Sequence, residues 1–214
     1  MCEFGTKDYF EKNARLTLIY LYDANFVNLE VDNKERPDIQ SEKLSIGIEV
    51  VRAIDNNMGL TSKITIECFE KKLSFKEISE KVIAKKHFKG SLSEVNGMTI
   101  ISPTKNFIYD TDDNIAKIKE KILFKLAKLN SNDYNIFDIN GLYIFSASCL
   151  VDENKIKELL YEMPKEHTKF NRYFDMYFIN CIDKLYIYDC SKKFLEKFEL
   201  SAELRKKIDK ELIN

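Results

Sequence analysis

Helical stripes and apolar strand runs alternate along the chain, and this alternation restricts the fold more than any other feature of the sequence. The clearest helix spans about 112–130, where isoleucine and leucine recur every three or four residues and lysines fill the positions between them. The apolar run LYIFSASCLV, residues 142–151, follows this helix and is typical of a buried central strand. We therefore predict an α/β (α+β) fold, in which a mixed β-sheet is flanked by helices.

The same periodicities predict the remaining elements. A length of 214 residues suits one well-cored domain, so we expect a single domain over residues 1–214. The predicted helices are 7–23, 74–88, 153–163 with Asp152 as its N-cap, and 201–213; the predicted strands are 26–31, 98–102 ended by Pro103, and a hairpin of 174–179 and 184–189.

Composition narrows the class of protein and its partners. Charged residues make up 32% of the chain and hydrophobic residues 44%, which is typical of a globular protein. The net charge of −1 provides no global attraction to nucleic acid, so any phosphate-binding surface must be local. The five cysteines form no CxxC pair, and no apolar run approaches the roughly 20 residues that cross a bilayer. We expect a cytoplasmic protein without a membrane partner.

One stretch, RPDIQSEKLSIGIEVVRA at residues 36–53, raises a specific question of chemistry. We interpret residues 36–54 as an antiparallel hairpin, with a polar SEK corner between its two strands. Glu49 lies in the middle of the second strand, among isoleucine and valine. A carboxylate in such a strand is costly to bury unless it is paired, hydrogen-bonded or bound to a metal.

Strand alternation decides which side chains accompany Glu49. Asp38 and Gln40 share one face of the first strand, and an even number of loop residues would place them on the face of Glu49. With an odd number they would lie on opposite faces. In the even case Asp38 and Glu49, with Gly47 leaving room between the strands, would form a site for Mg²⁺ or Mn²⁺. The alternative interpretation is that Asp38 accepts turn or capping hydrogen bonds.

In that alternative, Glu49 pairs with Arg36 or Arg52 across an exposed face of the sheet.

The run PDIQ…GIEVV, however, resembles the PD-(D/E)xK superfamily of restriction-endonuclease-like nucleases. Pro37 and Asp38 match the PD of that motif, and Glu49 matches its second acidic position. The chain is similar, more closely, to small uncharacterised bacterial and phage proteins that carry PDxQ followed by GIEV. The resemblance implies a core of helix, antiparallel hairpin, helix and strand.

The resemblance also implies roles for further residues. Asp38, Glu49 and Gln40 would be catalytic, with Asp38 and Glu49 holding the metal. Val51 stands at the lysine position of the motif, so the missing cation would come from Lys125 or Lys128 on the helix at 112–130. These two lysines are also the expected contacts to nucleic acid.

An acidic residue from the first helix often completes such sites in this superfamily. Glu11 is the candidate on that helix, and Glu30 and Glu35 are alternatives nearer the hairpin. The competing interpretation for all three is a solvated surface carboxylate. The only two histidines, His87 and His167, lie in lysine-rich surroundings and are interpreted as surface residues, so a histidine metal cluster is excluded.

Three functional hypotheses follow. The first is a metal-dependent nuclease-like enzyme that hydrolyses phosphodiesters in nucleic acid, foremost DNA, with a homodimer as an expected assembly. The second is a catalytically inactive nuclease-fold binding module, favoured by Val51 and the near-neutral charge. The third is an unrelated α+β interaction protein, such as a phage or defence accessory factor, in which the hairpin carboxylates are surface ion-pair partners.

Overall fold

The computed structural model describes residues 6–31, 37–53, 73–83, 90–95, 98–103, 111–131, 134–146 and 151–213. The chain divides into two compact units, which are described separately below: residues 1–53 together with 111–214, and residues 54–110. Compactness alone does not show that a unit folds by itself, so the single domain over 1–214 stays a prediction.

The larger unit is built on a mixed sheet, as predicted, and this sheet has seven strands. Its strands run in the order β1-β2-β3-β6-β7-β8-β9, with β3, β6 and β7 parallel and every other neighbouring pair antiparallel. The strands are β1 (Glu30–Val31), β2 (Ile39–Ser41), β3 (Ile46–Ala53), β6 (Ile139–Ser146), β7 (Met176–Asn180), β8 (Lys184–Asp189) and β9 (Phe194–Glu199).

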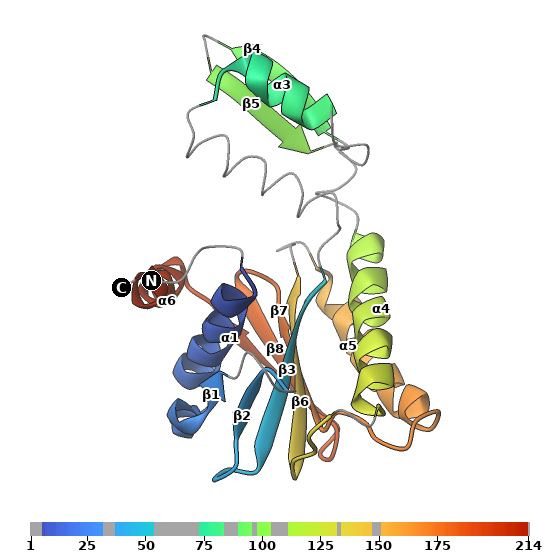
Figure 1. The fold of residues 1–214 in the computed structure, drawn as a ribbon. Helices are drawn as coiled ribbons and strands as arrows, with labels where there is room; N and C mark the ends of the chain where they lie inside the picture. The colour runs from blue at the N-terminus through green and yellow to red at the C-terminus, as the bar shows by residue number, and fades with distance from the viewer. Residues whose placement is uncertain are drawn as a thin grey trace. The chain divides into compact units, whose positions relative to one another are not determined.

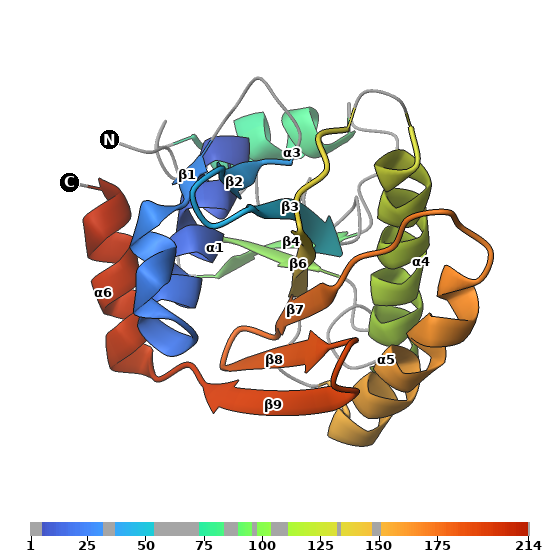
Figure 2. The same cartoon turned by 90° about the horizontal axis from the view of Figure 1, so that it is seen from below.

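Helices cover both faces of this sheet and produce three layers (Figures 1 and 2). The first face carries α1 (Lys7–Leu21), with α6 (Ala202–Ile213) packed beside it, and the second carries α4 (Thr111–Leu129) and α5 (Glu153–His167). A 3₁₀ helix, η1 (Ala24–Asn28), follows α1. No helix among the described residues is long and apolar enough to cross a membrane.

Helix α4 and strand β6 form for the reasons that the sequence indicates. The α4 stripe of Ile118, Ile122, Leu126 and Leu129 is completely buried against the second face, as its three- and four-residue spacing predicts. Strand β6 lies between two parallel neighbours with its central residues, from Asn140 to Ser146, buried. A strand in that position must be apolar on both faces, which explains the continuous apolar run.

The predicted hairpin is formed by β2 and β3. Gln40 lies opposite Gly47, which is the even-numbered case of the loop. Gly47 is required at this position because a Cβ atom there would lie 2.5 Å from Cδ2 of Phe137 and closer still to Cγ of Pro37. The ring of Pro37 therefore packs against the backbone of β3, and this contact helps to fix the entry of the chain into the hairpin.

The smaller unit joins the end of β3 to the start of α4 along the chain. It contains α3 (Phe75–Ile83) and a two-stranded antiparallel sheet of β4 (Gly90–Val95) and β5 (Met98–Pro103). The helix predicted at 74–88 is confirmed over α3, and its remainder lies outside the described residues. The strand predicted at 98–102 is β5, whereas β4 was not predicted.

Three boundaries differ from the prediction. Of the strand predicted at 26–31, only Glu30 and Val31 form a strand (β1), whereas 26–28 belong to η1, because the Asp23 side chain accepts a hydrogen bond from the Asn25 backbone and begins a tight turn. Helix α5 continues through Pro164 to His167, since buried Met163 and His167 hold its last turn against the sheet. The edge strand β9, with its mostly exposed polar side chains, was not predicted.

Candidate functional site

Asp38 lies immediately before β2 and closes the edge of β3. The residue is 3% exposed, and its Oδ2 accepts a hydrogen bond of 2.9 Å from the backbone N–H of Val50. β2 pairs with β3 only as far as the Ile39–Ile48 pair, so Asp38 satisfies a donor that β2 does not reach. The carboxylate is thereby fixed at the point where the hairpin loses its pairing.

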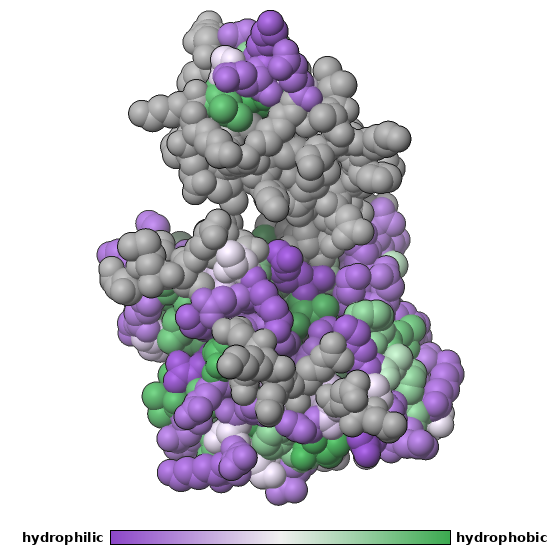
Figure 3. All heavy atoms as spheres, viewed as in Figure 1, coloured by the Kyte–Doolittle hydropathy of each residue, from purple (hydrophilic) through white to green (hydrophobic). Residues whose placement is uncertain are grey.

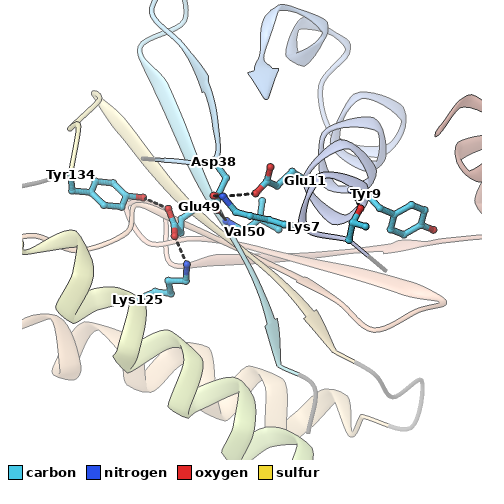
Figure 4. A network of polar contacts seen from close by, with 9 residues as sticks. Lys7, Tyr9, Glu11, Asp38, Glu49, Val50, Lys125 and Tyr134 are labelled. Atoms are coloured by element: carbon cyan, nitrogen blue, oxygen red, sulfur yellow. Dashed lines mark hydrogen bonds and ion pairs between the residues drawn. The ribbon is translucent and has the colours of Figure 1, made fainter. Parts of the chain in front are cut away.

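Helix α1 supplies two charged side chains to Asp38. Thr6 caps the helix, and Lys7 and Glu11 follow one turn apart on the same side. The Nζ atom of Lys7 lies 2.8 Å from Oδ1 of Asp38 and 3.0 Å from Oε1 of Glu11. Figure 4 shows the Lys7 side chain reaching across to Asp38, with the Glu11 carboxylate beside it. We call Lys7, Glu11 and Asp38 the α1 cluster.

Glu11 is the least satisfied carboxylate of the site. It is 1% exposed, which overturns the surface interpretation; its Oε1 is paired with the Lys7 ammonium, and its Oε2 has no hydrogen-bond donor among the described residues. Burial raises the pKa of Glu11 to about 7, with the Lys7 ammonium opposing this shift and the Asp38 charge adding to it. Of the alternatives, Glu30 is exposed and Glu35 lies outside the described residues.

The electrostatics of Lys7 follow from the same contacts. Burial alone lowers the pKa of this ammonium, but its contacts with Asp38 and Glu11 outweigh burial and raise the pKa above its ordinary value. The side chain is nevertheless 63% exposed, so solvent reaches much of its length.

Glu49 points to the opposite helix layer. It is 2% exposed, its Oε1 is paired with the ammonium of Lys125 on α4, and its Oε2 accepts a 3.3 Å hydrogen bond from the Tyr134 hydroxyl. The Lys125 side chain is only 11% exposed. We call Glu49, Lys125 and Tyr134 the α4 cluster. Its ion pair offsets the cost of placing a carboxylate in a buried strand.

The two predicted metal ligands therefore turn to different helices, although the loop has the even number of residues that would place them on one face (Figure 4). The cause is that Asp38 precedes β2, where strand alternation no longer sets its direction, and the Val50 N–H and Lys7 bind it. The alternative pairing of Glu49 with Arg52 on an exposed face is wrong, since Glu49 is buried and its two oxygens are engaged by Lys125 and Tyr134. Arg52 instead places its Cζ atom 4.7 Å from the centroid of the Phe10 ring. Arg36 lies outside the described residues.

Three other residues that the sequence singled out belong to neither cluster. Gln40 lines a separate hollow of about 1070 Å³ beside β1 and β2. Lys128 places its ammonium 4.6 Å from the centroid of the Phe124 ring. Val51 packs against the apolar core on the α4 side.

A cavity of about 300 Å³ opens between α1, the end of β3 and α4. Its lining contains four cationic side chains, and Glu11 is the carboxylate among them. In the space-filling view, a hydrophobic area between α1 and α4 is bordered by strongly hydrophilic side chains (Figure 3). The cations are Lys7, Arg52, Lys121 and Lys125.

Sequence reasoning missed Lys7 and Tyr134 and misjudged His167. The four-residue spacing of Lys7 and Glu11 could have indicated their pairing, whereas nothing in the sequence marks Tyr134. His167 is 8% exposed, and its Nε2 lies 2.8 Å from the Tyr177 hydroxyl. Burial lowers the pKa of His167. His87 lies outside the described residues.

The carboxylate oxygens of the site suit a hard divalent cation. Asp38, Glu11 and Glu49 offer oxygen ligands, and Oε2 of Glu11 is buried without a hydrogen-bond donor among the described residues. Within the described ranges, no three histidine, cysteine or acidic side chains form a ready-made metal cluster. Magnesium retains several waters and needs only one or two carboxylates, so the residues fit this ion.

No protein-family model, curated protein or solved structure matches this chain.

Proposed function

We propose that the protein is a divergent metal-dependent nuclease-like enzyme of the PD-(D/E)xK class, which hydrolyses phosphodiesters in nucleic acid, foremost DNA. The observation that carries this proposal is that the β2–β3 hairpin buries carboxylates beside lysines on both of its sides, Asp38 and Glu11 with Lys7 and Glu49 with Lys125. Burying three carboxylates in so small a region is expensive, and a functional requirement explains why the chain retains them.

The order of the elements supports the same proposal. A helix (α1) precedes an antiparallel hairpin (β2 and β3), and a second helix (α4) then leads to a strand (β6) that is parallel to β3. This is the succession of helix, hairpin, helix and strand that the PDIQ…GIEVV resemblance implies. Asp38 begins the hairpin and Glu49 lies within β3, at the two acidic positions of that motif.

Each residue has a role in the proposed site. Asp38 and Glu49 would hold Mg²⁺ or Mn²⁺, and Glu11 would add a third carboxylate from α1. Bound there, the ion would supply a Lewis acid that activates water and offsets the charge of the phosphate. Lys125 would replace the motif lysine, since its ammonium already contacts Glu49 although Val51 occupies the motif position. Gln40 lines a different hollow and has no role in this proposal.

A second candidate function is a nucleic-acid-binding module without catalysis. Both oxygens of Glu49 are already engaged, by Lys125 and by Tyr134. If that pairing persists in solution, Glu49 is a structural group, and the basic cavity can still bind phosphate.

Calorimetric titration with Mg²⁺ and Mn²⁺ tests the proposal. We expect the unmodified protein to bind a divalent ion, and the Asp38→Ala/Glu49→Ala double variant to lose that binding while circular dichroism shows a retained fold. Because the double variant removes two buried partners, the single variant Asp38→Asn provides a milder test. Glu42→Ala, at an exposed position of the β2–β3 turn, is the matched control.

Cleavage of labelled DNA and RNA oligonucleotides in the presence of the bound ion completes the test. Ion-dependent cleavage that Asp38→Asn abolishes supports the enzyme. Binding of oligonucleotide without binding of an ion supports the module instead. Ion binding that is unchanged in both variants contradicts the assignment of Asp38 and Glu49 as ligands.

A further inference from the structure

One side of α4 carries lysines around a single aromatic ring. Lys117, Lys121, Phe124, Lys125 and Lys128 follow one another at steps that place them along one side of the helix. Phe124 is 52% exposed, although its neighbours on the buried stripe of α4 are completely covered. An isolated exposed aromatic residue is ordinary by itself, so its surroundings must decide whether it has a function.

The surroundings of Phe124 are cationic. Its side chain lines the 300 Å³ cavity together with Arg52 and Lys121, and the Lys128 ammonium lies 4.6 Å from its ring centroid. Arg52 is stacked over Phe10, a second aromatic residue of the same lining. Exposed aromatic faces among flexible cations are the combination that binds unpaired nucleotides, because the bases stack and the phosphates are neutralised.

We propose that Phe124 is a stacking platform for an unpaired base, and that Arg52 and Lys121 contact the phosphates that flank this base. The ligand class is therefore single-stranded nucleic acid, or a strand with at least one unpaired nucleotide. This inference rests on the proposed function only in taking nucleic acid as the ligand. The Lys128 ammonium leaves the ring when the base stacks, and it then becomes available to phosphate.

The same residues argue against the main alternative, a symmetric contact with a second copy of the chain. In a two-fold symmetric dimer this surface would face itself, and the lysines around Phe124 would oppose lysines. Like charges in that position are repulsive, whereas a polyanion relieves the repulsion.

The chain contains no tryptophan, and this permits a direct test. In Phe124→Trp, the introduced indole is the sole tryptophan, and its fluorescence reports stacking by a base. Phe194→Trp is the matched control, because Phe194 is 53% exposed and lies on β9, an edge strand of the sheet, rather than on α4. The probe is an oligothymidylate of about 12 nucleotides, a length within the range of single-strand binding sites, in EDTA so that no cleavage occurs.

We expect the single strand to quench Phe124→Trp, a duplex of the same length to quench it much less, and neither to affect Phe194→Trp. Fluorescence anisotropy with a labelled oligonucleotide gives the contribution to affinity. Phe124→Ala should weaken single-strand binding about tenfold, while Phe194→Ala should leave it unchanged. Circular dichroism confirms that both alanine variants are folded.

The outcomes separate this inference from the proposed function. Intact single-strand binding with an unquenched Phe124→Trp overturns the stacking platform, and so does equal affinity of the unmodified protein for duplex. If the stacking platform is overturned but the unmodified protein still cleaves nucleic acid in an ion-dependent reaction, the proposed nuclease function is retained. Quenching of Phe124→Trp without any ion binding supports the platform and contradicts the catalytic proposal.

Discussion

The α1 cluster and the α4 cluster each pair a buried carboxylate of the hairpin with a lysine, but the two lysines differ in their exposure to solvent. Each satisfies a buried carboxylate of the hairpin with a lysine from a helix, Asp38 with Lys7 and Glu49 with Lys125. The side chain of Lys7 is 63% exposed, whereas that of Lys125 is 11% exposed. Glu49 has both oxygens engaged, whereas in the α1 cluster only Oε1 of Glu11 is paired, with the Lys7 ammonium, and its Oε2 has no donor among the described residues.

This difference indicates which ion pair contributes more to stability and which cluster can exchange its cation. Removing one partner of an enclosed pair leaves an uncompensated buried charge, so we expect the Glu49–Lys125 pair to contribute more to stability than the contacts of Lys7. An ammonium on a solvent-exposed chain can swing away at small cost, and another cation can take its place. The α1 cluster is therefore the side at which a metal ion could enter.

The largest expected effect on stability comes from the Glu49–Lys125 ion pair, and it tests whether this pair is shielded from solvent. Lys125→Met should lower the free energy of unfolding by about 3 kcal/mol or more, because it leaves the Glu49 carboxylate buried without its cation. Urea denaturation monitored by circular dichroism measures the change. Lys128→Met, one turn further along α4, is the control and should stay within about 0.5 kcal/mol. A loss below 1 kcal/mol for Lys125→Met would show that the pair is open to water.

A second effect concerns the pH dependence of the α1 cluster. The pKa of Glu11 is raised from 4.5 to about 7, so the folded protein holds this proton more tightly than the unfolded chain. Stability from Glu11 is fully present below pH 4.5 and is lost as the pH rises through 7, a change of about 2 to 3 kcal/mol. Urea unfolding between pH 4.5 and pH 8, without divalent ions, measures it.

The variant Glu11→Gln removes this titration and should flatten the difference between acidic and neutral pH. Glu42→Gln carries the same substitution at an exposed position and should keep the profile of the unmodified protein. Parallel profiles for the unmodified protein and Glu11→Gln would place the raised pKa elsewhere in the molecule.

The smallest expected effect on stability is that of removing Lys7, in contrast to the large effect of removing Lys125. Lys7→Met should cost only about 1 kcal/mol, because most of the Lys7 side chain already lies in solvent. In calorimetry the same variant should bind Mg²⁺ several times more tightly, since no ammonium competes for Asp38 and Glu11. Unchanged or weaker ion binding in Lys7→Met would mean that the ion does not use the position between these two carboxylates.

The sequence predicted the parts of the site that depend on local pattern. Strand alternation and the PDIQ…GIEVV pattern singled out Asp38 and Glu49, and the structure has the even loop, one of the two cases that the sequence left open. The stripe of α4 left Lys125 on a side that could reach β3. The helix that carries Glu11 was also predicted, although the burial of that carboxylate was not.

The remainder depends on tertiary packing. Alternation sets the direction of a side chain only inside a strand, so it could not show that Asp38 would turn to α1. Tyr134 reaches Glu49 from a connecting segment whose path no periodicity describes. His167 looked solvated because lysines surround it in the sequence, but the continuation of α5 past Pro164 buries it.

The contact between Pro37 and Gly47 has a consequence for how this hairpin can vary. Because a Cβ atom at position 47 would overlap both Pro37 and Phe137, the three positions share one small volume. A lineage can therefore enlarge residue 47 only after both residue 37 and residue 137 have made room for the added atom. Among distant relatives we expect these three positions to change together, so that the proline at position 37 depends on a glycine ten residues later.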